Sequence, residues 1–209
     1  MAQYFLIHPT HPQPRLLQQA AQIVHGGGLI VYPTDSCYAL GCQIGNKPAM
    51  DRIRAIREVD EHHHFTLVCR DLSEIARYAR VDNRAYRMLK AATPGSYTFI
   101  LRATREVPRR LQNPRRKTIG LRIPHHAVAQ GLLAELQEPL LSSTLLLPGD
   151  ELPLNDAQEI RARLEHRVEL VLDAGSCGIE MSTVVDLTGE QPQILRSGKG
   201  DLAVFGAVV

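Results

Sequence analysis

Short strand-like runs alternate with amphipathic helical patterns along the whole chain, and this alternation limits the possible folds more than any other feature. In the helical patterns, such as Leu16–Val24, Met50–Ile56 and Val128–Leu136, apolar residues recur every three or four positions. Such a chain folds as a mixed α/β protein. Because the alternation is irregular, with paired helices over Leu72–Ala92, we expect an α+β arrangement, a mixed sheet with flanking helices. The nine strands expected are Tyr4–Ile7, Leu29–Tyr32, Phe65–Cys69, Tyr97–Arg102, Thr118–Ile123, Pro139–Ser143, Val168–Leu172, Ser182–Leu187 and Gln193–Arg196.

The composition is that of an ordinary globular protein, since 44% of the 209 residues are apolar and 22% are charged. It excludes a largely disordered or low-complexity chain. No Gly/Ser-rich or Pro-rich linker divides the sequence, so we expect a single domain over residues 1–209. The N-terminal apolar run Tyr4–Ile7 is too short for a membrane span or a signal-peptide core. We therefore expect a cytoplasmic protein without a membrane partner.

Neither cysteine nor histidine spacing predicts a metal site. The four cysteines lack a CxxC pair, and we expect free thiols rather than disulfides or a structural zinc site. The histidines of the run His62–His64 are adjacent, whereas chelation from one helix face needs i, i+4 spacing. We interpret this run as a solvated loop. The cysteines are Cys37, Cys42, Cys69 and Cys177.

The basic residues are unevenly distributed. The formal net charge of the whole chain is only +2, yet residues 102–117 carry seven cations against the single acid Glu106, a local charge of +6. Prolines within this segment predict a loop that displays its cations outward. Because aromatic residues are absent, base stacking is disfavoured and contact with an RNA backbone is favoured; a merely solvated basic loop is the alternative. The candidate RNA-binding residues are Arg105, Arg109, Arg110, Arg115, Arg116 and Lys117.

Small polar residues gather where apolar strands end. Thr34, Asp35 and Ser36 follow Pro33 after a buried strand, in the place where α/β sheets bind ligands, although turn chemistry alone also explains them. Arg122 lies near the end of another apolar strand, where it suits carboxylate capture or a surface position. Three hydroxyls, Ser142–Thr144, sit inside a core strand and must either bond to the backbone or line a pocket.

Taken in order, these segments resemble the YrdC-like domain of the threonylcarbamoyl-AMP synthases, over about residues 12–198. The family shows a PTxxxYGLG-like element, a PGxxT turn, an RxP strand end, an STSAN-like stretch, an STVVD strand and a final RxG. The resemblance is greatest to the YciO branch. The matching segments are Pro33–Gly41, Phe65–Glu74, Pro94–Leu101, Thr118–Pro124, Ser142–Leu146, Ser182–Asp186 and Arg196–Gly198.

The resemblance implies a twisted mixed sheet with an open, positively charged cavity. It also implies that L-threonine, bicarbonate and ATP, with Mg²⁺, form threonylcarbamoyl-adenylate for tRNA modification, and that the protein binds double-stranded RNA. No permanent cofactor or protein-bound metal is implied. Carried over by residue, threonine would be held by Thr34, Arg122, Ser142 and Ser182. The nucleotide would be held by Arg57, Thr118, Thr144 and Arg196, with Arg57 and Thr144 in the catalytic positions. His63 or His64 falls near a family position that contacts threonine.

Two family pairs are altered in this chain. The Lys-x-Arg pair aligns with Arg57-Glu58-Val59, and the Ser-x-Asn pair with Thr144-Leu145-Leu146, so one cation and one amide are absent. Removing a preorganised donor at developing charge costs about a hundredfold in rate. We therefore expect an RNA- and adenylate-binding protein of the YciO type with weak or altered synthase chemistry. The alternative is a full synthase that works with Arg57 and Thr144.

Overall fold

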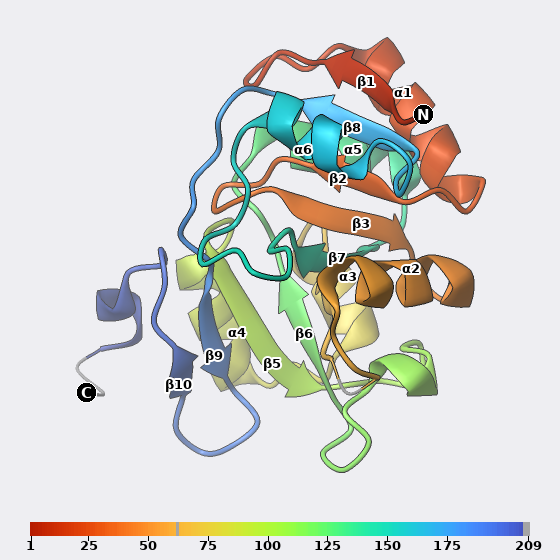
Figure 1. Ribbon diagram of the computed structural model, residues 1–209. Helices are drawn as coiled ribbons and strands as arrows, with labels where there is room; N and C mark the ends of the chain where they lie inside the picture. The colour runs from red at the N-terminus through yellow and green to blue at the C-terminus, as the bar shows by residue number, and fades with distance from the viewer. Residues whose placement is uncertain (62, 207–209) are drawn as a thin grey trace.

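One ten-stranded sheet organises the chain in the computed structural model, which describes residues 1–61 and 63–206. Its strand order is β1-β8-β2-β3-β7-β4-β6-β5-β9-β10 (Figure 1). Four neighbouring pairs are parallel, namely β1·β8, β2·β8, β4·β6 and β5·β9, and the other five are antiparallel. The mixed α/β class is therefore confirmed. The strands are β1 Gln3–Leu6, β2 Ile30–Tyr32, β3 Ala39–Gln43, β4 Thr66–Val68, β5 Tyr97–Arg102, β6 Thr118–Arg122, β7 Leu140–Thr144, β8 Leu170–Asp173, β9 Thr183–Asp186 and β10 Gln193–Arg196.

Helices cover both faces of the sheet. Buried side chains of α1 and α5 form one core with β2 and β8, while those of α2, α3, α4 and α6 belong to a second core. Side-chain caps fix several helix starts: Asn46, Asp71, Asp82 and Asp156 each accept a backbone N–H three residues on. The helices are α1 Pro14–His25, α2 Lys47–Arg57, α3 Leu72–Tyr78, α4 Asn83–Ala92, α5 Ala127–Leu136 and α6 Ala157–Leu164, with short 3₁₀ turns η1 Arg109–Leu111 and η2 Leu202–Phe205.

The nine expected strands are confirmed, with ends shifted by one or two residues, and a tenth strand was not predicted. This strand, β3, pairs with both β2 and β7. Its alanine and glycine are poor strand formers, and the polar residues that precede it have the composition of a turn. Gly41 is needed there, because a Cβ at this position would lie 2.6 Å from a Leu140 methyl group. Tertiary packing therefore overrides local propensity in this strand.

The sheet changes direction near its middle, and this change creates the site. In Figure 1, β2 and β3 cross the upper part of the molecule, while β5 and β9 run downward below them and β6 runs upward, antiparallel to β5. The two halves of the sheet meet where β7 pairs with β4. This pairing ends at Ser142, which lies opposite Thr66. Ser143 and Thr144 continue beyond that point, paired only with β3. The two halves of the sheet therefore diverge on either side of these hydroxyls.

Within the described residues, no helix is long and apolar enough to cross a membrane. The four cysteines are free thiols, three of them buried and Cys177 half-buried.

Candidate functional site

A cavity of about 430 Å³ opens where the two halves of the sheet diverge. Its walls come from the β2–β3 turn, from β4, β5, β6, β7, β9 and β10, and from the end of α2. The charged groups that line it are guanidinium groups; no aspartate or glutamate of the described chain belongs to its wall. These arginines are Arg57, Arg116, Arg122 and Arg196.

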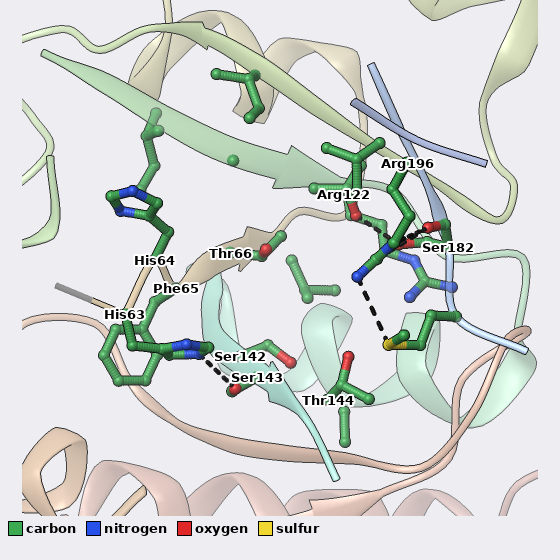
Figure 2. Close-up of a pocket in the computed structure, with 18 of the residues that line it drawn as sticks. His63, His64, Phe65, Thr66, Arg122, Ser142, Ser143, Thr144, Ser182 and Arg196 are labelled. Carbon is green, nitrogen blue, oxygen red and sulfur yellow. Dashed lines mark hydrogen bonds between the residues drawn. The ribbon is translucent and has the colours of Figure 1, made fainter. Parts of the chain in front are cut away.

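Arg57, the last residue of α2, is fixed against one wall. Its Nη1 donates to Ser143 Oγ at 2.6 Å and lies 3.1 Å from His63 Nε2, and its Nε donates to the carbonyl of Leu146 at 3.3 Å. Ser143 Oγ and His63 Nε2 are 3.0 Å apart (Figure 2). Burial and the positive charge of Arg57 lower the pKa of His63 to about 4. The imidazole is therefore neutral at pH 7.

Arg122, at the end of β6, forms a buried ion pair with Asp35 of the β2–β3 turn. Asp35 also accepts a hydrogen bond from Ser96 Oγ at 2.8 Å. Burial alone would raise the pKa of Asp35, but Arg122 and the Ser96 hydroxyl outweigh it and hold that pKa below its usual value. The Nε of Arg122 is buried and has no hydrogen-bond partner among the residues that the structure describes. An unpaired buried donor of this kind is costly, so a ligand acceptor at Arg122 would relieve that cost.

Arg196, at the end of β10, is held by the adjacent strand. Its Nη2 and Nε donate to the carbonyl of Ser182 at 2.9 and 3.1 Å, and its Nη1 contacts the Met181 sulfur at 3.5 Å. Ser182 Oγ in turn bonds to Thr98 Oγ1 at 2.8 Å. Gly198 permits this close approach, because a Cβ there would lie 2.2 Å from the Met181 carbonyl. Figure 2 shows Arg196 and Arg122 side by side near Ser182, across the cavity from His63 and Ser143.

The arginines are close enough to act on one another. Burial lowers the pKa of Arg57, and the positive charge of Arg196 lowers it further, against the opposing effect of Cys37. Burial likewise lowers the pKa of Arg196, with Arg122 adding to the shift. Since guanidinium groups remain protonated in proteins, the cavity wall holds several positive charges that repel one another. An anion of suitable size would relieve their repulsion.

The hydroxyl groups expected at the site also reach the cavity. Ser142 Oγ bonds to Tyr32 OH at 2.7 Å. Thr34 Oγ1 donates to the Cys37 carbonyl at 2.6 Å and accepts from the backbone N–H groups of Ser36 and Cys37, so the turn holds this side chain on several sides. The structure thus brings all eight residues predicted to hold threonine or nucleotide to one cavity. They are Thr34, Arg57, Thr118, Arg122, Ser142, Thr144, Ser182 and Arg196.

The residues at the two altered family positions lie outside the cavity wall. Val59 is half-buried just after α2, and Leu146 contributes its backbone carbonyl to Arg57 rather than its side chain to the cavity. The neighbouring Arg52 and Arg54, which repeat the two-cation spacing, pair with Glu169 and Asp51. They belong to other networks and do not line the cavity.

The candidate RNA-binding residues lie on exposed chain between β5 and β6. Two of them are also tied to the fold. Arg110 donates to the Gly45 carbonyl, and Arg116 pairs with the buried Asp186 at 2.6 Å and donates to Thr188 Oγ1 at 2.9 Å. Because Arg116 also lines the cavity, the basic segment forms part of its rim. Arg105, Arg109, Arg115 and Lys117 are exposed.

Two site features were misjudged or undervalued from sequence. The solvated-loop interpretation is wrong for His63, which is half-buried in the cavity wall; His64 also lines the cavity but is exposed, and His62 lies outside the described residues. The Asp35–Arg122 pair was not predicted, although Asp35 stands in the polar turn that drew attention to this segment. The sequence position of His63, two residues before the core residue Phe65, could have indicated that it is partly buried. The two rings meet edge-on at a centroid distance of 5.3 Å. Among the described residues, no group of histidine, cysteine or carboxylate side chains could hold a metal ion.

Fold and site together define a protein with a twisted mixed sheet and a cavity suited to an anionic ligand with polar substituents. Residues 22–198 match the Sua5/YciO/YrdC family model, which is described as telomere recombination, and the chain belongs to this family. It is 58% identical to an uncharacterized protein of Haemophilus influenzae and 54% identical to YciO of Escherichia coli K12; both alignments cover 98% of this chain and all of the relative. A threonylcarbamoyl-AMP synthase of Chromobacterium violaceum is 31% identical over 90% of this chain and 96% of its own length.

Solved structures agree with this assignment. The crystal structure of E. coli YciO matches with a TM-score of 0.94 over 98% of this chain and all of that one. P. abyssi Sua5, solved in complex with L-threonine, matches with a TM-score of 0.84 over 93% of this chain and 57% of that one. At 23% identity, the likeness to Sua5 shows a shared fold.

Proposed function

We propose that this protein binds ATP or an adenylate in the cavity, together with RNA on its basic rim, and has weak or altered threonylcarbamoyl-AMP synthase chemistry. The observation that carries the proposal is the convergence of Arg57, Arg122 and Arg196 on one cavity. These residues come from α2, β6 and β10, so only the folded chain unites them. Several guanidinium groups around one cavity of this size suit a polyphosphate or phosphoanhydride.

The bonding of the arginines divides the cavity into two zones. Arg57 and Arg196 are held through neutral groups, so their positive charge is left for a ligand phosphate. Arg122 is balanced by Asp35, and its surroundings suit a group with both charges, such as the amino acid threonine. The L-threonine complex of P. abyssi Sua5 supports this choice of substrate class. Bicarbonate would then be the third reactant, as in the related synthases.

Mg²⁺ is expected to arrive with the nucleotide. The cavity wall offers hydroxyl and guanidinium groups and no carboxylate among its described residues, so the protein itself is a poor Mg²⁺ ligand. Mg²⁺ commonly takes its ligands from substrate phosphates and water. The phosphates of ATP would therefore hold the ion, with Thr144 as an available hydroxyl.

Weak synthase chemistry follows from the groups near Arg57. The valine and leucine that replace a cation and an amide contribute no donor toward departing pyrophosphate. A full synthase remains the second candidate, and the 31% identity to the C. violaceum synthase favours it.

Isothermal calorimetry tests nucleotide binding. Mg-ATP is expected to bind the wild-type protein, and the double variant R57Q/R196Q should bind at least tenfold more weakly, because two charge-assisted contacts contribute about 1.5–3 kcal/mol each. R15Q/R87Q, at exposed arginines of α1 and α4, is the matched control and should bind as the wild type does. Equal binding by R57Q/R196Q and wild type would contradict the proposal.

Pyrophosphate release from ATP separates the two candidates for chemistry. We expect slow release that L-threonine and bicarbonate stimulate little. Rapid release that depends on both would establish the full synthase instead.

RNA binding is tested by charge reversal on the rim. R105E/R109E/R115E changes exposed residues and leaves the tethered Arg110 and Arg116 in place. Binding of a fluorescent RNA duplex should weaken steeply as salt rises, and the triple variant should lose affinity and flatten this dependence. R15E/R87E/K90E, at exposed residues of α1 and α4, makes the same change in net charge and is the control. An unchanged salt dependence in the triple variant would remove RNA from the proposal.

A further inference from the structure

One wall of the cavity holds a hydroxyl, an imidazole and a guanidinium in mutual contact. Ser143 Oγ lies 3.0 Å from His63 Nε2, and Arg57 Nη1 lies 2.6 Å from the first and 3.1 Å from the second. All three side chains line the cavity. A hydroxyl within hydrogen-bond distance of a base that a third group holds in place is the arrangement of an activated nucleophile.

The hydrogen-bond partners of His63 determine which of its ring nitrogens carries the proton. A guanidinium group only donates, so His63 Nε2 faces Arg57 as an acceptor and carries its lone pair there. The ring proton therefore belongs on Nδ1. Ser143 Oγ accepts from Arg57 and can direct its own proton to Nε2. The single lone pair of the neutral imidazole is therefore shared between Arg57 Nη1 and the Ser143 hydroxyl, and it can take the Ser143 proton.

The backbone supports this pair. Ser143 lies in β7 and is paired with Leu40 of β3, so its position is fixed by a strand on one side. The β4 ladder ends at the preceding residue, which leaves room on the other side for the chain that carries His63. The ring of His63 packs edge-on against Phe65 at a centroid distance of 5.3 Å.

We propose that Ser143 is a nucleophile, with His63 as its base, that hydrolyses an acyl adenylate in this cavity. This inference rests on the proposed function, since it requires that the cavity accept an adenylate. Ser143 Oγ attacks the carbonyl carbon while His63 Nε2 takes the hydroxyl proton. The bond between that carbon and the bridging oxygen breaks, AMP leaves with the electron pair, and an acyl ester of Ser143 forms.

Water completes the reaction. It attacks the ester carbonyl as the neutral His63 takes its proton, after the first proton has passed to the departing AMP or to solvent. The ester bond then breaks, Ser143 Oγ regains a proton from His63, and a carboxylic acid is released. The balance is one acyl adenylate and one water giving one carboxylic acid and AMP. Arg57, beside Ser143 Oγ, would stabilise the negative charge that develops on that oxygen.

The same cluster could instead serve only to hold Arg57 for a phosphate. The two roles differ in what the loss of each group does. If holding is the whole role, removal of Ser143 or His63 weakens nucleotide binding and no covalent species forms. If the pair is catalytic, the same removals stop acyl transfer while nucleotide binding persists.

Acetyl adenylate, a simple acyl adenylate, is the probe for the experiment. AMP release above the buffer rate is measured for wild type, S143A and H63Q, with S73A and H166Q as matched controls at exposed serine and histidine positions. Loss of a positioned general base lowers rates by about 10²–10⁴-fold. We expect losses of that order in S143A and H63Q and wild-type rates in the controls. Rapidly quenched wild-type protein should carry one acetyl group on Ser143 by peptide mass spectrometry.

Calorimetry with Mg-ATP on the same samples separates the outcomes. Binding without AMP release in the wild type, or wild-type rates in S143A, would overturn the nucleophile and leave the proposed function standing. Absence of ATP binding in the wild type would instead overturn the proposed function itself. Retention of ATP binding by S143A and H63Q, together with loss of AMP release, is the expected result.

Discussion

At the scale of single residues, the site depends on how a few charges are compensated. Arg57 and His63 lie side by side, and the positive charge of the first keeps the second neutral. His64, Arg54 and Asp60 also act on the imidazole: the two basic groups oppose its protonation, and the carboxylate favours it. A ligand phosphate against Arg57 would cancel the main opposing charge. The proton affinity of His63 should therefore report occupation of the cavity.

Replacing Arg57 with glutamine should raise the pKa of His63 from about 4 toward its ordinary value of 6.5. The guanidinium charge is removed while burial remains, so the rise should be partial. Titration of the His63 imidazole signals by NMR measures it, with R52Q as a control for an arginine on the same helix that pairs elsewhere. Saturating Mg-ATP should shift the wild-type pKa in the same direction. An unmoved pKa in R57Q would show that burial alone keeps His63 neutral.

The Asp35–Arg122 pair makes a prediction about stability. Replacing Asp35 with asparagine leaves a buried guanidinium without its counterion, which costs about 3–5 kcal/mol in proteins. D51N breaks an exposed pair with Lys47 and a half-buried one with Arg54 and should cost less, about 1 kcal/mol. Urea denaturation at pH 7 measures both. Because the folded-state pKa of Asp35 is lowered, its contribution to stability is full above the unfolded pKa and is lost as pH falls through the folded one. Equal costs for D35N and D51N would show that the buried pair has no special role.

At the scale of elements, an ion pair helps to attach the basic segment to the sheet. Arg116 reaches Asp186 at the end of β9, and Asp186 also accepts from the backbone and hydroxyl of Thr188. D186N should weaken the attachment while keeping the side-chain shape. We expect faster amide hydrogen exchange in residues 112–117, measured by mass spectrometry, with little change in α1. Unchanged exchange would mean that the turn around Asn113 holds the segment by itself.

The same scale shows how far sequence reasoning reaches. Apolar runs and helical spacing identified nine strands and the core faces because each pattern is local. β3 was missed because its pairing with β2 and β7, rather than its composition, makes it a strand. The motif positions brought Arg57, Arg122 and Arg196 into one expected site. Their partners could not be predicted, since Asp35 and Arg122 meet only through the ladder order of the folded sheet.

At the scale of the whole molecule, the fold does not depend on the few side chains that differ from the synthase motifs. One ten-stranded sheet brings the arginines together, and the match to E. coli YciO extends over the full length of that protein. The departures from the two synthase pairs are Arg57 and Thr144 themselves and two residues near Arg57: Val59 follows it by two residues, and the Leu146 carbonyl accepts its Nε. A small number of substitutions should therefore raise the synthase activity that we propose to be weak, without altering the fold.

The quadruple variant R57K/V59R/T144S/L146N recreates both family pairs on this scaffold. We expect threonine- and bicarbonate-dependent pyrophosphate release from ATP to rise by at least tenfold over wild type, because a preorganised donor at developing charge is worth about a hundredfold in rate. The control replaces V59R with V59E in the same background. It adds a negative charge in place of the positive one at the same position and should give no gain. If the quadruple variant folds with the wild-type circular dichroism spectrum and binds ATP but gains no activity, the altered pairs do not account for the weak chemistry, and the divergence lies elsewhere in the cavity wall.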